Sequence, residues 1–247
     1  MVVRGCCGRF GRVLTEAVAK AEDMHLFAGV DRAHTGESGV YPNLQSLPDG
    51  AEVILDATHH GAVGEVLTYA RERRIPCVIA TTGFTEQEWA EIREASKVVP
   101  VLQSANLSVG LAMLREFATR AAKSFPEGDV EIVECHRRGK QDAPSGTAKQ
   151  LAEEIAAVRG GGDIQYGRRG DAPGKKGEIG VHSLRMGETA GEHTVILTTA
   201  NQQLVLRHTA LDRSPFAEGA LRAIRYVYRQ KTGFYTMTDL CGERICD

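Results

Sequence analysis

Short apolar runs rich in β-branched residues alternate with amphipathic segments over the first hundred or so residues of the chain. Between the first two runs the apolar positions recur at three-and-four spacing, which predicts a helix with one face on a sheet. This alternation, from Met1 to about Asn106, is typical of a parallel sheet built from βαβ units. The predicted strands are 1–4, 25–30, 52–57, 77–80 and 99–103, and the clearest further helices are 61–73 and 85–96.

The hydrophobic pattern changes after residue 106. An apolar helix, a strand and a second helix come first, followed by a stretch rich in glycine and arginine that predicts a mobile loop. Three successive antiparallel strands are then expected, with a turn at 200–202 between the last two, and one more helix ends the pattern. In chain order these elements are the helix 109–124, the strand 129–135, the helix 147–158, the loop 160–177, the strands 179–185, 193–199 and 203–208, and the helix 216–228.

Composition and charge narrow the class of protein. The 247 residues, 42% of them hydrophobic and 6% aromatic, suit a soluble α/β protein of one large or two modest domains. Thirty basic residues against 32 acidic ones give a net charge of -2, which argues against a nucleic-acid or membrane-surface partner. No stretch approaches the roughly 18 uninterrupted apolar residues of a membrane span, and no apolar leader is evident, so a cytoplasmic protein with a small-molecule partner is expected.

The cysteines do not form a recognisable framework. Six of them, at positions 6, 7, 77, 135, 241 and 246, are too few and too irregularly spaced for a secreted disulfide-rich domain, so reduced thiols are expected. Neither the cysteine pairs nor the adjacent His59 and His60 have the ligand spacing of a zinc site. We therefore predict no metal.

A glycine-rich segment follows the first predicted strand. Residues 5–11 read Gly-Cys-Cys-Gly-Arg-Phe-Gly, a GxxGxxG arrangement that lets the backbone approach a pyrophosphate at the start of a helix. Asp31 lies 20 residues past Gly11, where an acid that binds the ribose is expected. Arg9 and Arg32 could meet a 2'-phosphate, so NADH and NADPH both remain candidates. A tight turn with solvated charges is the alternative.

Two other predicted strands end in small polar residues. Residues 80–84 read Ala-Thr-Thr-Gly-Phe, and residues 104–107 read Ser-Ala-Asn-Leu. Because ligands of open α/β sheets bind outside the carboxyl ends of the strands, these hydroxyl and amide groups suit a nicotinamide and its ribose. In isolation both segments would be ordinary turns.

The segment 134–148 reads Glu-Cys-His-Arg-Arg-Gly-Lys-Gln-Asp-Ala-Pro-Ser-Gly-Thr-Ala. Its serine, Ser145, is a natural N-cap for the helix that follows. Backbone N–H groups of the next two residues, with Arg137 and Lys140 nearby, make an anion site suited to carboxylates. His136 and Lys140 can supply general acid–base chemistry. A solvated basic loop before a well-capped helix is the alternative.

This segment resembles the signature E-x-H-H-x-x-K-x-D-A-P-S-G-T-A of the 4-hydroxy-tetrahydrodipicolinate reductases, the NAD(P)H enzymes of bacterial and plant diaminopimelate and lysine synthesis. The similarity extends to the GxxGRxG loop, to A-T-T-G-F, to S-A-N-L-S-V-G and to L-D-R-S-P-F-A-E-G-A near the end. The D-A-P-S-G-T-A run is highly specific, whereas the glycine loop is not. Two positions depart from the pattern: Arg137 replaces the second histidine, and residues 57–60 read Ala-Thr-His-His instead of F-T-x-P.

The resemblance implies an oxidoreductase that reduces 4-hydroxy-tetrahydrodipicolinate, a small dicarboxylate, to tetrahydrodipicolinate with NADH or NADPH. It implies a Rossmann-type dinucleotide-binding domain, 1–105 with 213–247. The remaining residues, 106–212, would form an α+β domain with a mixed sheet that binds substrate and assembles a homotetramer. A reductase of another carboxylated imine or carbonyl, and a non-catalytic NAD(P)-binding sensor, remain as alternatives.

The resemblance also assigns roles to particular residues. The family's catalytic acid–base pair matches His136 and Lys140. The residues expected to bind substrate are Arg137, Ser145, Gly146, Thr147 and Arg213. The residues expected to bind the cofactor are Gly5, Cys6, Cys7, Gly8, Arg9, Phe10, Asp31, Arg32, Ala80, Thr81, Thr82, Ser104, Ala105, Asn106 and Leu107.

Overall fold

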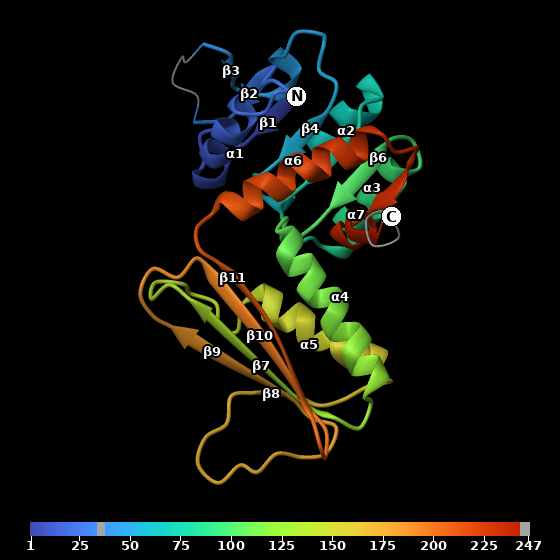
Figure 1. Ribbon diagram of the computed structural model, residues 1–247. Coiled ribbons are helices and arrows are strands. Elements are labelled where there is room, and N and C mark those ends of the chain that lie inside the picture. The colour runs from blue at the N-terminus through green and yellow to red at the C-terminus, as the bar shows by residue number, and fades with distance from the viewer. Residues whose placement is uncertain (34–37, 243–247) are drawn as a thin grey trace. The chain divides into compact units, whose positions relative to one another are not determined.

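The computed structural model describes residues 1–33 and 38–242 (Figure 1). The chain forms two compact units: one consists of the described residues of Met1–Val109 and Ser214–Asp247, and the other is Gly110–Arg213. A parallel sheet lies in the first unit and a mixed sheet in the second, which confirms the predicted α/β class with a Rossmann-type sheet. The five cysteines in the described part of the chain are free thiols, and Cys246 lies outside it.

The first unit is built on a seven-stranded sheet with the order β12-β6-β5-β4-β1-β2-β3. All of its paired strands run parallel, and the strand order reverses at β1, which lies between β2 and β4. A reversal of this kind opens a crevice at the carboxyl ends of the strands. The strands are β1 (Val2–Arg4), β2 (Ala28–Val30), β3 (Val40–Tyr41), β4 (Ile54–Asp56), β5 (Cys77–Ile79), β6 (Pro100–Gln103) and β12 (Gly233–Tyr235).

Helices flank this sheet in two pairs, α1 against α6 and α2 against α3 (Figure 1). Because both faces are covered, strand residues of either orientation are buried, and the central strands are continuous apolar runs. Two charged residues interrupt this pattern at strand ends, Arg4 on β1 and Asp56 on β4, and both are buried. The helices are α1 (Arg9–Ala19), α2 (Val63–Arg73), α3 (Glu86–Ser96), α6 (Ser214–Tyr228) and α7 (Met237–Gly242), with short 3-10 turns η1 (Leu44–Ser46) and η2 (His60–Ala62).

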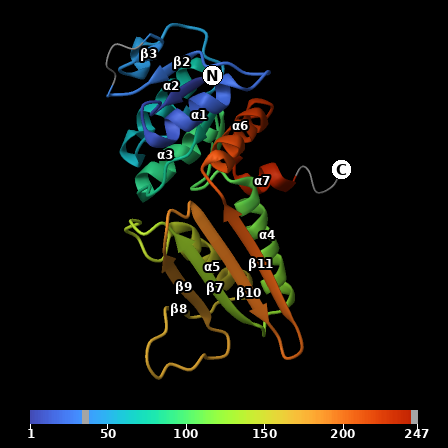
Figure 2. The same ribbon diagram turned by 60° about the vertical axis from the view of Figure 1, so that its left-hand side comes forward.

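The second unit is a five-stranded mixed sheet with the order β11-β10-β7-β9-β8. Its helices α4 (Val109–Ser124) and α5 (Gly146–Val158) lie against one face of the sheet (Figure 2). Alternate residues of β7, Val130 and Ile132, pack with the apolar faces of both helices. No helix of the described residues is long and apolar enough to cross a membrane. The strands are β7 (Asp129–His136), β8 (Ile164–Tyr166), β9 (Ile179–Arg185), β10 (Gly191–Thr198) and β11 (Gln203–Ala210).

Two expectations for the second unit are wrong. The stretch 160–177, predicted as a loop, contains the short edge strand β8, which pairs in parallel with β9. The strand β9 is not an antiparallel neighbour of β10, because it runs parallel to β7. The hydrophobic alternation of a strand fixes which residues face the core, but it does not fix which strand lies alongside. The antiparallel pair β10–β11 and its turn, closed by the N–H of Thr199 and the carbonyl of Gln202 at 2.9 Å, are confirmed.

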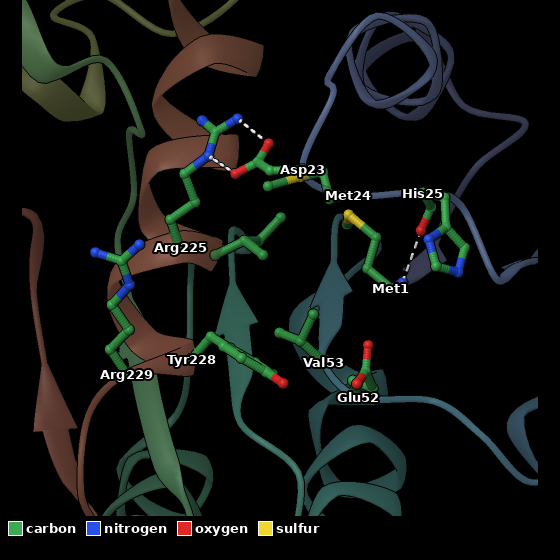
Figure 3. Close-up of a pocket in the computed structure, with 10 residues that line it drawn as sticks. Met1, Asp23, Met24, His25, Glu52, Val53, Arg225, Tyr228 and Arg229 are labelled. Atoms are coloured by element: carbon green, nitrogen blue, oxygen red, sulfur yellow. Dashed lines mark hydrogen bonds and ion pairs between the residues drawn. The ribbon is translucent and has the colours of Figure 1, made fainter.

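A cavity of about 360 Å³ opens at the amino-terminal end of β1 (Figure 3). On its rim Arg225 of α6 donates two hydrogen bonds of 2.7 Å to Asp23, and these bonds lower the pKa of Asp23 to about 2. This end of the strands is opposite the carboxyl edge that carries the glycine-rich turn, so the cavity is separate from the predicted dinucleotide site. It is lined by Met1, Asp23, Met24, His25, Glu52, Val53, Ile224, Arg225, Tyr228 and Arg229.

Candidate active site

The glycine-rich turn joins β1 to α1. Gly5 has a φ of +84°, and a Cβ at Gly11 would lie 2.0 Å from the carbonyl oxygen of Gly5, so neither position admits a side chain without a shift of the backbone. Gly8, the N-cap of α1, provides no side-chain hydrogen bond, and the first turn of the helix has no acidic residue. The first N–H groups of α1 and its positive dipole end are therefore free of intramolecular competition for an anion.

Asp31 follows β2 directly and contacts the glycine-rich turn. Its Oδ2 accepts a hydrogen bond of 3.0 Å from the backbone N–H of Cys7, and its Oδ1 accepts one of 2.9 Å from Ala33. The carboxylate is thus fixed beside the turn, as a residue that binds an adenosine ribose requires. Arg9 and Arg32 are exposed around it.

The predicted nicotinamide segments follow the adjacent strands β5 and β6. Thr81 is only 5% exposed, yet its Oγ1 has no hydrogen-bond partner in the described residues. Its carbonyl accepts a bond of 3.1 Å from Gln103, and Ser104 and Asn106 bond to each other within their own turn. A buried hydroxyl without a partner is rare in proteins. It fits a ligand group at this edge of the sheet, and the residues present here suit a dinucleotide.

Cys6, Cys7 and Asp31 bring three potential metal-ligand atoms within 4.8 Å of one another, and in the part of the chain that the structure describes no other group of three does so. Burial and the adjacent Cys7 raise the pKa of Cys6 to about 12, which disfavours the thiolate that a metal needs. His60 bonds to Glu88 at 2.9 Å, and neither His59 nor His60 belongs to such a group.

In the second unit, the carboxylate of Glu134 is the centre of the candidate catalytic cluster. Glu134 lies on β7 with 0% exposure, and Arg185 of β9 donates to its two oxygens at 3.0 and 2.8 Å. The backbone N–H of Ser145 donates to it at 3.2 Å. Burial alone would raise the pKa of Glu134, but the bonds from Arg185 outweigh it and lower the pKa below its ordinary value. Glu134 is an ionised carboxylate that ties β7 to β9 and to the start of α5.

His136 lies at the end of β7, and its two ring nitrogens have different surroundings. Its Nδ1 lies 3.2 Å from the carbonyl oxygen of Ala190, which can only accept, so Nδ1 carries the hydrogen. The Nε2 atom is buried with no hydrogen-bond partner in the described residues and is 3.5 Å from Glu134 Oε2. Burial, aided by the charge of Lys140, lowers the pKa of His136 although Glu134 opposes this. The resting imidazole is neutral, with its lone pair at Nε2.

Lys140 and the start of α5 already hold a carboxylate, that of Asp142. The Nζ of Lys140 is 2.7 Å from Asp142 Oδ1, and the backbone N–H of Gly146 is near enough to this side chain to help lower its pKa. Partial burial would raise the pKa of Asp142, but the bond from Lys140 leaves it below the usual value. A carboxylate, that of Asp142, therefore lies between Lys140 and the start of α5.

Ser145 caps α5 as the sequence predicts. It is 2% exposed, and its Oγ accepts the N–H of Ala148 at 3.2 Å and lies 3.3 Å from Nε2 of His193. Burial, then the proximity of His136, lowers the pKa of His193 to about 4, so this ring is neutral. These contacts direct the hydroxyl of Ser145 toward the protein interior, whereas Gly146 is exposed.

The other three residues predicted to bind substrate are Thr147, Arg137 and Arg213, and their side chains are half-buried or exposed. Thr147 is half-buried in the first turn of α5. The backbone of Arg137 is fixed by a bond of 2.9 Å from its N–H to the carbonyl of Thr189, and its side chain is half-buried. Arg213 is exposed in the connection between β11 and α6. No hydrogen bond between described residues joins Arg213 to Glu134, His136 or Lys140.

The sequence analysis did not assign roles to Glu134, Arg185, His193 and Asp142. One signal was present for Glu134, because Val130, Ile132 and Glu134 alternate along β7 and must share the buried face of the strand. Arg185 had no such signal, since only the unforeseen pairing of β9 with β7 brings it to Glu134. These two charged strand residues form a buried ion pair.

Comparison with known proteins identifies relatives along the whole chain. Residues 1–107 match the family model described as dihydrodipicolinate reductase, N-terminus, and residues 110–241 match the one described as dihydrodipicolinate reductase, C-terminus. The 4-hydroxy-tetrahydrodipicolinate reductase of Caldanaerobacter subterraneus subsp. tengcongensis is 38% identical over 243 residues, and that of Clostridium novyi is 36% identical over 245. Both alignments cover 97% of each chain.

A solved structure supports the same relationship. The dipicolinate-bound dihydrodipicolinate reductase from Paenisporosarcina sp. TG-14 superposes with a TM-score of 0.82 at 28% identity. The match covers 96% of this chain and 97% of the other. Both units therefore have counterparts in a protein of this description.

Proposed function

The chain belongs to the dihydrodipicolinate reductase family, and from this we propose that it reduces 4-hydroxy-tetrahydrodipicolinate to tetrahydrodipicolinate with NADH or NADPH, as an oxidoreductase of diaminopimelate and lysine biosynthesis. The observation that carries the proposal is the anion site at the start of α5. There Lys140 and the N–H of Gly146 hold a carboxylate, in a cluster that also contains the neutral His136. Such a site suits a carboxylated substrate that must be protonated.

We assign the two halves of the reaction to different parts of the chain. Residues 1–105 with 213–247 bind the dinucleotide, which is supported by the glycine-rich turn at the point where the strand order reverses. Residues 106–212 bind the substrate, which is supported by the cluster around Glu134 and His136. A cytoplasmic location is part of this proposal, because it is the compartment of amino-acid biosynthesis in bacteria.

A bound dinucleotide would supply a hydride to C4 of the substrate ring, after or with loss of the 4-hydroxyl as water. The N–H groups at the start of α1 would hold its pyrophosphate, and Asp31 would accept a hydrogen bond from the adenosine ribose. Thr81, whose Oγ1 has no hydrogen-bond partner among the described residues, would bind at the nicotinamide end. The neighbouring residues Ala80, Thr82 and 104–107 would complete this end of the site.

The proton is handled by His136. Its Nδ1–H is held by the carbonyl of Ala190, so Nε2 is the atom that takes up a proton and passes it to the ring carbon next to the one that receives the hydride. The carboxylate of Glu134, 3.5 Å from Nε2, stabilises the imidazolium once it forms. Lys140 neutralises a substrate carboxylate and thereby assists the addition of electrons to the ring.

Asp142 must release Lys140 before a substrate carboxylate can bind there. We expect Asp142→Asn to lower the dissociation constant of dipicolinate by about 1.5- to 5-fold, since a half-exposed ion pair contributes roughly 0.2–1 kcal/mol. Isothermal titration calorimetry measures this constant, and Asp163→Asn in the exposed segment after α5 is a control of equal charge change. Weaker binding in Asp142→Asn would show that Asp142 supports the site and does not compete with the ligand.

The proposed reaction is tested by following NADH and NADPH absorbance with freshly generated 4-hydroxy-tetrahydrodipicolinate. Oxidation of either cofactor that depends on this substrate is the expected result. Turnover only with other carboxylated imines or carbonyls would favour the alternative reductase. Binding of a dinucleotide with no turnover of any substrate would favour the sensor.

We further propose that the chain assembles a homotetramer through the face of the mixed sheet opposite α4 and α5. The strands of this face expose Leu184 to 47% and Val205 to 50%, and the cross-strand partner of Val205, Ile196, points the same way. A second copy of the face would remove these apolar side chains from water. No helix of the described residues covers it (Figure 2).

Light scattering coupled to size-exclusion chromatography tests this assembly. We expect about four times the chain mass for the wild type and a smaller species for Val205→Lys, because a lysine ammonium cannot be buried there without a partner. Val158→Lys, at a half-exposed valine of α5 on the other layer, is the matched control and should leave the mass unchanged. A monomeric wild type would contradict the proposal.

A further inference from the structure

Arg4 is a buried cation immediately before the glycine-rich turn, at a strand position that is ordinarily apolar. It is 5% exposed. Its Nη1 donates a bond of 2.8 Å to the carbonyl of Ala62 and lies 3.5 Å from Asp56, the residue beside it in the sheet. Its Nη2 contacts Glu65 of α2. The guanidinium is therefore held by contacts to two carboxylates and one carbonyl.

Glu65 connects this fixed cation to the predicted cofactor site. One carboxylate oxygen, Oε2, is bound by Arg4, and the other, Oε1, is 3.6 Å from Nη2 of Arg32. The side chain of Arg32 is 81% exposed and follows Asp31, the predicted ribose acid. Because Arg4 binds one oxygen of Glu65, the position of the other oxygen does not depend on the exposed side chain of Arg32. That oxygen is therefore available to pair with Arg32.

We propose that Glu65, positioned by Arg4, determines the choice of cofactor by forming an ion pair with Arg32. As a result this protein binds NADH more tightly than NADPH. The inference rests on the proposed dinucleotide-binding function and extends it to a residue outside the glycine-rich turn. In this role Glu65 acts through Arg32, as a positioning residue, and need not touch the cofactor.

The charges around Arg32 give the physical reason. A 2'-phosphate carries close to two negative charges at neutral pH and needs a cation such as Arg32. Here that cation already faces the carboxylate of Glu65, and Asp31 precedes it in the chain, so a phosphate at Arg32 meets negative charge and must displace Glu65. The 2'-hydroxyl of NADH carries no charge and can donate to Asp31. The sequence alone left this balance open, since Asp31 favours the hydroxyl and Arg32 the phosphate.

The test compares cofactor dissociation constants, measured by nicotinamide fluorescence without substrate, in the wild type and in Glu65→Gln. Glutamine keeps the shape of glutamate and a hydrogen-bond acceptor for Arg4, but it removes the charge. We expect NADPH to bind about 3- to 10-fold more tightly in Glu65→Gln, from the loss of one ion pair and one repulsion, and NADH to change by less than about twofold. Glu72→Gln, on an exposed position of the same helix, is the control for the change in net charge and should leave the ratio unaltered.

A second variant identifies the route of the effect. Arg32→Gln added to Glu65→Gln should abolish the gain for NADPH, because the freed cation is then absent. A wild type that prefers NADPH, or an unchanged NADPH-to-NADH ratio in Glu65→Gln, would overturn the inference while leaving the proposed reductase intact. Failure of the wild type to bind either dinucleotide would refute the proposed function and this inference with it.

Discussion

Lys140→Ala is expected to lower kcat by about 10²–10⁴-fold, the range typical of a lost acid–base group. The ammonium of Lys140 lies beside the start of α5, where it binds Asp142 at 2.7 Å. With alanine in its place a substrate carboxylate would keep only backbone N–H groups, and the negative charge that develops during reduction would be less stabilised. Steady-state kinetics with 4-hydroxy-tetrahydrodipicolinate measures the effect.

The separate changes in kcat and KM show what Lys140 does. A rise in KM alone would mean that it binds substrate and transition state equally, whereas an equal fall in kcat and kcat/KM would mean that it acts in the transition state. Lys149→Ala, which removes an exposed lysine of α5, is the matched control and should be near normal. Near-normal turnover of Lys140→Ala would contradict the assignment.

The fold was largely predictable because most of its elements carry a strong hydrophobic period. The bounds of α4, 109–124, agree with the prediction at both ends, since its apolar positions repeat over four turns. The strand β8 had no such signal: it has three residues, lies in a stretch rich in glycine and arginine, and owes its form to pairing with β9. The parallel pairing of β9 with β7 could not be predicted from the sequence either, since it depends on packing between segments distant in sequence.

The candidate site was predictable where the backbone itself forms it. The glycine-rich turn and the cap of α5 at Ser145 follow from local chemistry, and the structure has both. The environment of His136 did not follow, because its Nδ1 bonds to Ala190 just before β10, and the neighbouring Glu134 is paired with Arg185 of β9. The sequence could propose which residues hold protons and charges. It could not show that Asp142 pairs with Lys140, or that Glu65 contacts both Arg4 and Arg32.

Glu134→Gln is expected to destabilise the protein by about 3–5 kcal/mol, because it breaks a buried ion pair by removing one partner. Glutamine still offers one oxygen to the N–H of Ser145, but its amide nitrogen would face the guanidinium of Arg185, donor against donor. Arg185, whose side chain is 17% exposed, would then retain an uncompensated charge in the sheet. Urea unfolding followed by circular dichroism measures the loss of stability. Glu131→Gln, on the same strand but the opposite face, is the control. It should cost less than about 1 kcal/mol of unfolding free energy, since its partners Arg168 and His182 lie nearer solvent.

The dependence on pH distinguishes this ion pair from a simple loss of packing. The pKa of Glu134 is lower in the folded protein than in the unfolded chain, so its contribution to stability is fully present above the unfolded value and is lost as the pH falls through the folded value. The difference in unfolding free energy between wild type and Glu134→Gln should therefore shrink on acidification below about pH 4.5. A difference that stays constant through this range would show that Glu134 acts by shape alone. Its charge would then support neither Arg185 nor, 3.5 Å away, the protonated form of His136.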